Sequence, residues 1–354
     1  MENLPNVTEF GVDTSEDIMT EGILWVSAVT VRVCVDSALA VCSFVTNIIN
    51  CLVFKRMGLD HTTEPFFILS FSDCLIGFLS ILGGVLNGLR YLGPARLTVS
   101  VYTLYLQALV PAVIASVSSM ASTTVIAVVR CCSVASPLRV HMLTARRQRV
   151  AILVCTGIAM AFVGYGVSST RLEVVTNNQT NTSHLIMKTL PDYIQRNKFP
   201  DMFRVVLFYI CFLTVNVCLV ILITALWRSY KFRESSTNRG DIHNKQSENI
   251  ETQAKTTKRF AGFKPASKEA QVVKVVVLVA AVFTVCNIPI VVATTFRLLD
   301  PRMAVNGALY RSFDFVMMMV ECFSLINTSV NIIIYLKFNS RYYTSFRNTI
   351  FRNQ

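Results

Sequence analysis

The chain has 354 residues, of which 53% are hydrophobic and 15% are charged, and its formal net charge is +12. Soluble domains carry about 25% charged residues, so this composition excludes an ordinary soluble protein and indicates a membrane protein. Because the positive charge gathers in segments between apolar runs, it indicates membrane orientation rather than nucleic-acid binding, and we expect no nucleic-acid partner.

Seven runs are long and apolar enough to cross a bilayer, which requires about 20 mostly apolar residues. Helices satisfy their own backbone hydrogen bonds in lipid, and the runs are too long for the strands of a barrel. The sequence therefore predicts an all-α membrane protein, a seven-transmembrane helix bundle that occupies residues 24–336. The runs are 24–54, 65–90, 101–129, 149–169, 203–227, 271–296 and 311–336.

The tail before the first run, residues 1–23, is acidic and contains no lysine or arginine. Basic residues gather instead after the first, third, fifth and seventh runs, and the positive-inside rule makes that side cytoplasmic. We therefore expect a multi-pass protein of the plasma membrane with an extracellular N-terminus. N-glycosylation sequons fall on the predicted outer side at Asn6, Asn178 and Asn181.

Two cytoplasmic segments differ from the apolar runs. Residues 229–267 are rich in Ser, Thr, Asn, Lys and Glu and poor in aromatic residues, a composition that predicts a disordered loop. Residues 337–354 carry an apolar stripe at helical spacing, which predicts a short amphipathic eighth helix at the membrane surface followed by a short tail. The stripe consists of Phe338, Tyr342, Phe346 and Ile350.

Five short patterns then follow one another along the runs. They are Thr46 to Asn50, Leu69 to Asp73, Ala127 to Leu138, Phe283 to Pro289 and Asn331 to Tyr335. In that order and in those runs, they resemble the motifs of the rhodopsin-like (class A) G-protein-coupled receptors. The resemblance covers nearly the whole chain and implies a receptor that is not an enzyme. As partners it implies an extracellular ligand, a heterotrimeric G protein, arrestin and membrane lipids.

The resemblance also assigns a polar pocket inside the bundle. In the family, the second-run aspartate meets polar groups of the third and seventh runs around a sodium ion, and the matching residues are Asp73, Ser119, Asn327 and Asn331. Asn327 and Asn331 are four residues apart and therefore share one helix face. An allosteric sodium ion is the one non-protein component that we expect. The alternative is a polar cluster that only holds helices together.

Four further residues match the family's activation switches. Arg130 ends the third run at the cytoplasmic face, Phe283 and Pro289 lie in the sixth run, and Tyr335 lies in the seventh. By resemblance, the sixth helix moves about its proline, and the tyrosine swings toward Arg130 when the G protein engages.

Several positions depart from the family pattern. Val129 replaces the acid that normally precedes the arginine, and the cysteine of the usual outer disulfide is missing near the start of the third run. We therefore expect a less constrained second outer loop. This divergence resembles invertebrate chemosensory or orphan peptide-type receptors, such as neuropeptide receptors.

The outer halves of the runs restrict the ligand. The seventh run has no lysine for a retinal Schiff base, and Ala112 occupies the position at which amine receptors carry an aspartate. Neither retinal nor a biogenic amine is therefore expected. The polar residues that remain suit a peptide or a small polar chemosensory molecule, and the candidate contacts are Gln107, Asn287, Arg297 and Glu321. Glu321 could instead be neutralised by Arg32 of the first run.

Two other protein classes remain to be weighed. An ion-coupled transporter or channel that uses Asp73 is the main alternative, although the runs show no internal repeat. An enzyme is not supported, since the four histidines are scattered in loops and no nucleophile motif is present.

Overall fold

A computed structural model describes residues 21–60, 62–92, 101–135, 144–168, 170–177, 182–189, 193–247, 268–303 and 308–351. The predicted glycosylation sites Asn6, Asn178 and Asn181 lie outside the described residues.

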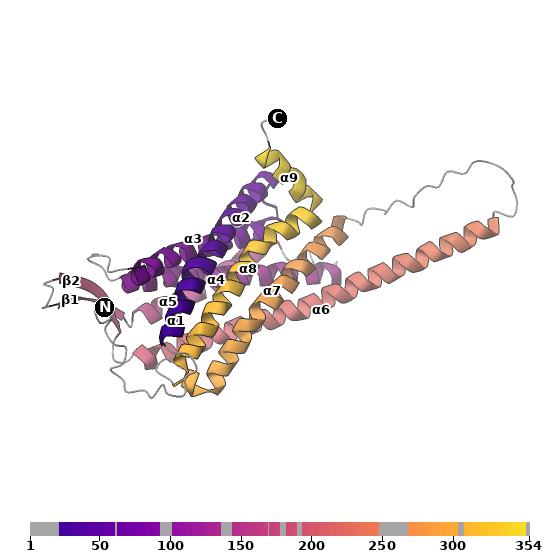
Figure 1. Ribbon diagram of the computed structural model, residues 1–354. Coiled ribbons are helices and arrows are strands. Elements are labelled where there is room, and N and C mark those ends of the chain that lie inside the picture. Colours follow the sequence, from indigo (N-terminus) through magenta and orange to yellow (C-terminus); the bar gives the residue numbers. More distant parts are fainter. Residues whose placement is uncertain are drawn as a thin grey trace.

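The long helices form a bundle, with a strand hairpin at one end and the short helix α9 at the other (Figure 1). The helices are α1 (Glu21–Ser27), the π-helical segment η2 (Ala28–Val35), α2 (Asp36–Met57), α3 (Glu64–Leu92), α4 (Val101–Ala135), α5 (Ala145–Val167), α6 (Tyr193–Ser247), α7 (Lys268–Leu299), the 3₁₀ turn η4 (Pro301–Met303), α8 (Tyr310–Phe338) and α9 (Ser340–Ile350). The strands are β1 (Thr170–Asn177) and β2 (Thr182–Thr189).

Within the described ranges, seven helices are long and apolar enough to cross a membrane, which confirms the predicted bundle. They are Val29–Met57, Glu64–Leu89, Thr103–Ala135, Ala145–Val167, Met202–Arg228, Val273–Leu299 and Arg311–Phe338. The largest difference from the sequence prediction is at the end of the third span, which we expected at residue 129 and which extends to Ala135.

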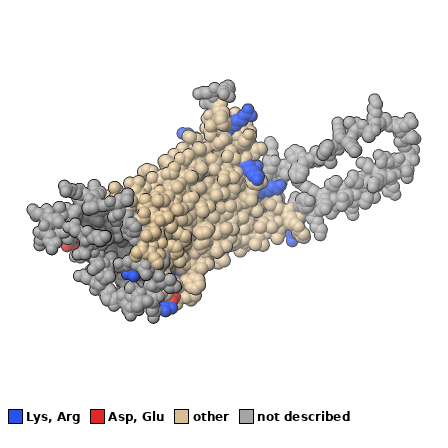
Figure 2. All heavy atoms as spheres, viewed as in Figure 1, with Lys and Arg blue, Asp and Glu red and all other residues tan. Residues whose placement is uncertain are grey.

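The surface of the bundle is suited to lipid. Figure 2 shows a broad belt without charged side chains, and the visible lysines, arginines and acids lie toward the two ends of the molecule. Apolar side chains in this belt point outward, including Leu153 and Leu213, each 60% exposed. Outward-facing leucines are unfavourable in water but favourable against hydrocarbon, so this exposure agrees with a membrane-spanning bundle.

The helices pack most tightly where small residues allow close approach. At Gly77 of α3, an added Cβ atom would lie 2.7 Å from the backbone nitrogen of Phe44 in α2. Near the α9 end, Phe54, Phe66, Tyr335 and Tyr342 form one aromatic cluster, with ring centroids 5.3 to 5.9 Å apart in the contacting pairs.

The loop after the fifth span differs from the prediction. We expected disorder over residues 229–267, but α6 continues as helix to Ser247, and residues 248–267 lie outside the described part. The physical reason is that extending an existing helix avoids the cost of nucleation.

The connection between the fourth and fifth spans contains a hairpin held by backbone hydrogen bonds. Strands β1 and β2 pair antiparallel from Thr170 opposite Thr189 to Asn177 opposite Thr182. Each of the eleven cysteines lies in the described part of the chain and is free. The hairpin therefore provides order that we had not expected in a loop without the family disulfide.

The predicted eighth helix is present as α9, and its first turns pack on protein. Asn339 ends α8, and its side chain caps α9 by accepting a hydrogen bond from the backbone nitrogen of Tyr342 at 3.1 Å. Tyr342 is fully buried, whereas Ile350 at the far end of the stripe is 46% exposed. Arg341 anchors the helix by donating to the carbonyl of Met57 at 2.9 Å.

The turn between α2 and α3 is held by Asp60. Its Oδ1 atom accepts hydrogen bonds from the backbone nitrogens of Thr62 at 2.9 Å and Thr63 at 2.8 Å, and Arg341 lies 3.5 Å from its Oδ2 atom. Burial opposes ionisation of this carboxyl, but the hydrogen bonds and the arginine outweigh it, so the pKa of Asp60 lies below its usual value.

Candidate functional site

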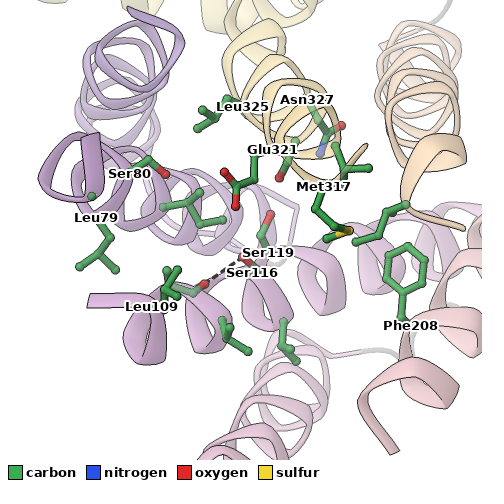
Figure 3. A pocket seen from close by; sticks show the side chains of 18 of the residues that line it. Leu79, Ser80, Leu109, Ser116, Ser119, Phe208, Met317, Glu321, Leu325 and Asn327 are labelled. Carbon is green, nitrogen blue, oxygen red and sulfur yellow. Dashed lines mark hydrogen bonds between the residues drawn. The ribbon is translucent and has the colours of Figure 1, made fainter. Parts of the chain in front are cut away.

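A cavity of about 710 Å³ lies within the bundle, a volume typical of small-molecule sites. Its walls come from η2, α2, α3, α4, α6, α7 and α8. Figure 3 shows Glu321 and Met317 of α8 directed into this space, with Phe208 of α6 and Ser80 of α3 on other walls. Ser119 of α4 and Asn327 and Thr328 of α8 are among the polar residues on its walls.

At the inner end of the cavity, the structure brings Asp73, Ser119 and Asn331 together. The Ser119 hydroxyl donates to Oδ1 of Asp73 at 2.5 Å, and the Asn331 amide donates to Oδ2 at 3.1 Å. Asp73 is 1% exposed, so these two donors satisfy a carboxyl group that would otherwise be costly to bury. The fourth member of the predicted pocket, Asn327, lies on the cavity wall one helical turn before Asn331.

A chain of buried hydrogen bonds runs from the backbone carbonyl of Asp73 toward α9. Ser43 and Thr328 share a hydrogen bond of 2.8 Å, and Asn47 donates to the Thr328 carbonyl at 2.9 Å. Asn50 donates to Oδ1 of Asn47 at 3.2 Å, and the Tyr342 hydroxyl donates to Oδ1 of Asn50 at 2.5 Å. Because Ser43 also lies 3.5 Å from the Asp73 carbonyl, α2 links the inner end of the cavity to the eighth helix.

The sequence interpretation assigned no polar contact to Ser43, Asn50 or Tyr342, and it placed Tyr342 only in the apolar stripe of the eighth helix. A signal was present, since Asn47 and Asn50 are three residues apart in an otherwise apolar run and therefore share a helix face. The partner of Asn50 could not be found in this way, because Tyr342 lies 292 residues further along the chain.

One wall of the cavity is charged. Arg32 of η2 donates to Oδ1 of Asp314 in α8 at 3.1 Å, and its Nε atom lies 4.0 Å from a carboxylate oxygen of Glu321. The sequence interpretation left Glu321 as a ligand contact or as the partner of Arg32. The structure places Glu321 close to Arg32 and also on the cavity wall, with 43% of its side chain exposed.

The other candidate ligand contacts are divided. Asn287 and Arg297 of α7 line the cavity, and the guanidinium of Arg297 lies 5.5 Å from the ring centre of Phe313. Gln107 does not line it and is exposed, so placing it in the cavity was wrong. The cavity face of α4 follows Ala108, Ala112 and similar positions, and Gln107 falls on another side of the helix.

The predicted switch residues lie at different depths. Phe283 is 3% exposed and lines the cavity, and Pro289 lies inside α7 without ending the helix. Tyr335 is 1% exposed and packs its ring 5.3 Å from Phe54 and 5.6 Å from Phe66. Arg130 lies near the last turn of α4 and is partly buried.

A family model described as "7 transmembrane receptor (rhodopsin family)" matches residues 46–335 of the chain. The matched region contains the Asp73 cluster, Arg130 and most of the cavity wall, and it ends at Tyr335. A search of curated proteins gave no match.

Proposed function

The chain belongs to the rhodopsin family of seven-transmembrane receptors, and from this premise we propose that it binds an extracellular ligand in the cavity and activates a heterotrimeric G protein. The observation that carries the proposal is the cavity of about 710 Å³, whose wall includes Ser119, the residue that donates to Asp73. A ligand in this cavity therefore lies beside the polar cluster inside the bundle.

Ligand binding acts by shifting an equilibrium between inactive and active arrangements, and it can do so only if the ligand contacts differ between them. Contacts to α7 and α8 are suited to this, because Asn287 and Glu321 lie on different helices of the cavity wall. Movement of α7 about Pro289, with Phe283 at the cavity wall, would carry the change toward the cytoplasmic end. There Arg130 and Tyr335 would meet the G protein, and arrestin would use the same face.

The donor set at Asp73 fits a sodium ion. Sodium is a hard cation that prefers oxygen ligands, and the Asp73 carboxylate and the Ser119 hydroxyl supply such oxygens. Asn327 and Asn331 would add amide oxygens from the adjacent turns of α8. The bound ion would neutralise the buried carboxylate and so favour the arrangement in which these side chains stay close.

The ligand that we propose is a peptide or a small polar molecule, as in chemosensory or neuropeptide receptors. The cavity wall supports this class because it carries arginine and carboxylate side chains beside apolar ones. We place the protein in the plasma membrane with its N-terminus outside and glycans at Asn6, Asn178 and Asn181. The acidic tail and the basic cytoplasmic segments support that orientation.

The test is G-protein activation in cells that express the full chain, measured without stimulus and with tissue extracts. We expect a signal that disappears in Arg130→Ala at equal surface expression. Arg146→Ala is the matched control, because Arg146 is an exposed arginine near the cytoplasmic start of α5. Equal loss in both variants, or no signal with any G-protein subtype despite surface expression, would contradict the proposal.

The ion-coupled transporter is not favoured by the family match. It still makes a distinct prediction, because it requires ion flux that depends on Asp73. If the protein is a receptor, it carries no ion current, so Asp73→Asn should leave the membrane current unchanged. A current that disappears in Asp73→Asn would support the transporter.

A further inference from the structure

The cavity wall carries more base than acid, and its charges are unevenly placed. Among the described residues, three arginines and two acids line the cavity, namely Arg32, Arg204, Arg297, Asp36 and Glu321. Both acids lie near Arg32, whose guanidinium is 4.0 Å from Glu321 and within electrostatic reach of Asp36. The other two arginines come from α6 and α7, and the described lining residues of these helices include no acid. The α6 and α7 part of the wall is therefore positively charged.

Arg297 has no acidic partner in the part of the chain that the structure describes. Its guanidinium forms no hydrogen bond or ion pair with a described residue, and Asp300, the next acid along the chain, pairs instead with Arg302 at 2.9 Å. The guanidinium lies 5.5 Å from the ring centre of Phe313, a favourable cation–π contact. A contact with a ring does not use the five N–H donors of the guanidinium, so these donors remain available to an acceptor in the cavity.

The surroundings of Arg297 are apolar. Phe313 is 8% exposed, and Ile290 and Met317 pack in the same cluster. All three line the cavity, and Figure 3 shows Met317 directed into it. A charge pair is stronger beside such side chains than in water, because the local dielectric constant is lower. One guanidinium next to an apolar wall therefore fits a ligand with one negative charge and an apolar body.

We propose that the ligand of this cavity carries a carboxylate that binds the guanidinium of Arg297, and an apolar body that packs against Phe313 and Met317. This inference rests on the proposed function in taking the cavity as the ligand site. The planar guanidinium presents two parallel N–H donors that match the two oxygens of a carboxylate. The carboxylate can belong to a small organic acid or to the C-terminus of a peptide, which present the same chemistry.

A second role of Arg297 makes a different prediction. The residue lies in the last turn of α7, where a positive charge interacts favourably with the helix dipole. That role requires only the charge, which lysine also supplies, whereas the carboxylate site requires the planar group with its two parallel donors. Replacement by lysine therefore separates the two roles.

The experiment uses the purified full-length protein in lipid nanodiscs and measures binding by titration in saturation-transfer NMR. The probe is phenylacetate, and its neutral control of nearly the same shape is phenylacetamide. We expect phenylacetate to bind at least about tenfold more tightly, because hydrogen bonds to charged groups contribute at least about one such factor.

Two variants locate the carboxylate. Arg297→Gln should weaken phenylacetate binding about tenfold, to the level of phenylacetamide, and should leave phenylacetamide binding unchanged. Arg297→Lys keeps the charge but loses one of the two parallel hydrogen bonds, so it should weaken phenylacetate binding about three- to tenfold. Arg171→Gln is the matched control, since it removes the same charge from an exposed position in β1 and should change neither affinity. Should Arg297→Gln fail to fold, Arg297→Lys decides.

The outcomes separate this inference from the proposed function. Equal binding of phenylacetate and phenylacetamide, no binding of either, or unchanged phenylacetate binding in Arg297→Lys would overturn the carboxylate site even if the chain activates a G protein. Selective phenylacetate binding that depends on Arg297, by a protein that activates no G protein, would support the carboxylate site and overturn the proposed function.

A third probe identifies the source of the carboxylate. It is a tripeptide that ends in phenylalanine with a free C-terminus, compared with the same tripeptide amide. Tighter binding of the free tripeptide than of phenylacetate would support the site with a peptide as the ligand. Weaker binding of the tripeptide, with phenylacetate still selective, would support it with a small organic acid.

Discussion

Replacing Tyr342 by phenylalanine removes one hydroxyl group from α9 and tests whether that helix is held by the bundle. The hydroxyl donates to Oδ1 of Asn50 at 2.5 Å, and both residues are fully buried. Burial raises the pKa of the Tyr342 phenol, so the hydroxyl keeps its proton and remains a donor at physiological pH. In Tyr342→Phe the ring contacts with Phe54 remain, and the Asn50 oxygen loses this donor.

The expected loss follows from that geometry. A buried acceptor left without its donor costs about 1 to 3 kcal/mol, whereas hydrogen bonds between helices in membrane proteins average about 0.6 and reach about 1.7 kcal/mol. Since neither residue has any exposed surface, we expect about 1 to 2 kcal/mol, at the upper end of the membrane range. This corresponds to a lowering of the apparent melting temperature by about 2 to 6 °C.

The assay is thermal unfolding of the purified protein, followed by a thiol-reactive dye that reports exposure of the buried cysteines. Tyr343→Phe is the control, because the neighbouring tyrosine is 53% exposed and its hydroxyl can reach solvent. In an Asn50→Leu background, Tyr342→Phe should lose clearly less stability, since its partner is already gone. Equal melting temperatures for Tyr342→Phe, Tyr343→Phe and the unmodified protein would refute the reasoning.

Three further predictions follow from the packing, the turn and the polar cluster. Gly77→Ala should lower the melting temperature by the equivalent of about 1 to 3 kcal/mol, because its Cβ atom would meet the α2 backbone. Gly157→Ala is the control and should leave the melting temperature unchanged, since an added Cβ atom there has nothing within 4 Å. Equal effects of the two substitutions would contradict the close approach of α2 and α3. The folded-state pKa of Asp60 is lowered, so the contribution of its carboxylate to stability is present at neutral pH and is lost as the pH falls below about 4. The difference in melting temperature between Asp60→Asn and the unmodified protein should be constant from pH 8 to pH 5 and should shrink at lower pH. A difference that disappears near pH 7 would contradict this role of Asp60. Asp73→Asn should remove the effect of sodium, relative to potassium, on agonist potency while surface expression persists, and undiminished sodium dependence would exclude Asp73 as the ion's ligand.

Much of the fold could be predicted because the bilayer imposes one length on every span. Charged residues such as Lys55 and Glu64 mark where a run leaves the membrane, so most span ends agree closely with the structure. The π-helical segment at Ala28–Val35 could not be predicted, because its composition is as apolar as that of an α-helix. The continuation of α6 to Ser247 was missed because the polar composition of the segment shows only that it cannot form a hydrophobic core of its own. Composition does not show that the segment can extend the helix that precedes it.

The site was predictable only in part, for a similar reason. Periodicity places Asn331 on an inward face, and the structure brings it to Asp73. Periodicity also fails where the orientation of the helix is unknown, as at Gln107, which is polar and in the outer half but faces away from the cavity. The contact between Arg32 and Asp314 joins residues 282 apart, and no local pattern indicates which of several acids the arginine meets.

The hydrogen bonds of the second helix also set an order in time. Asn47 and Asn50 are among the earlier residues to leave the ribosome, and their partners Thr328 and Tyr342 follow 281 and 292 residues later. At a synthesis rate of about 5 to 20 residues per second, the interval is about 15 to 60 seconds. During this interval Asn47 and Asn50 keep only their partners within the first span, the Ser43 carbonyl and Oδ1 of Asn47, while Oδ1 of Asn50 lacks the Tyr342 hydroxyl that satisfies it in the folded protein. A chain that ends before residue 342 keeps that defect permanently, which gives the quality-control machinery of the cell a physical mark by which it can separate truncated chains from finished ones.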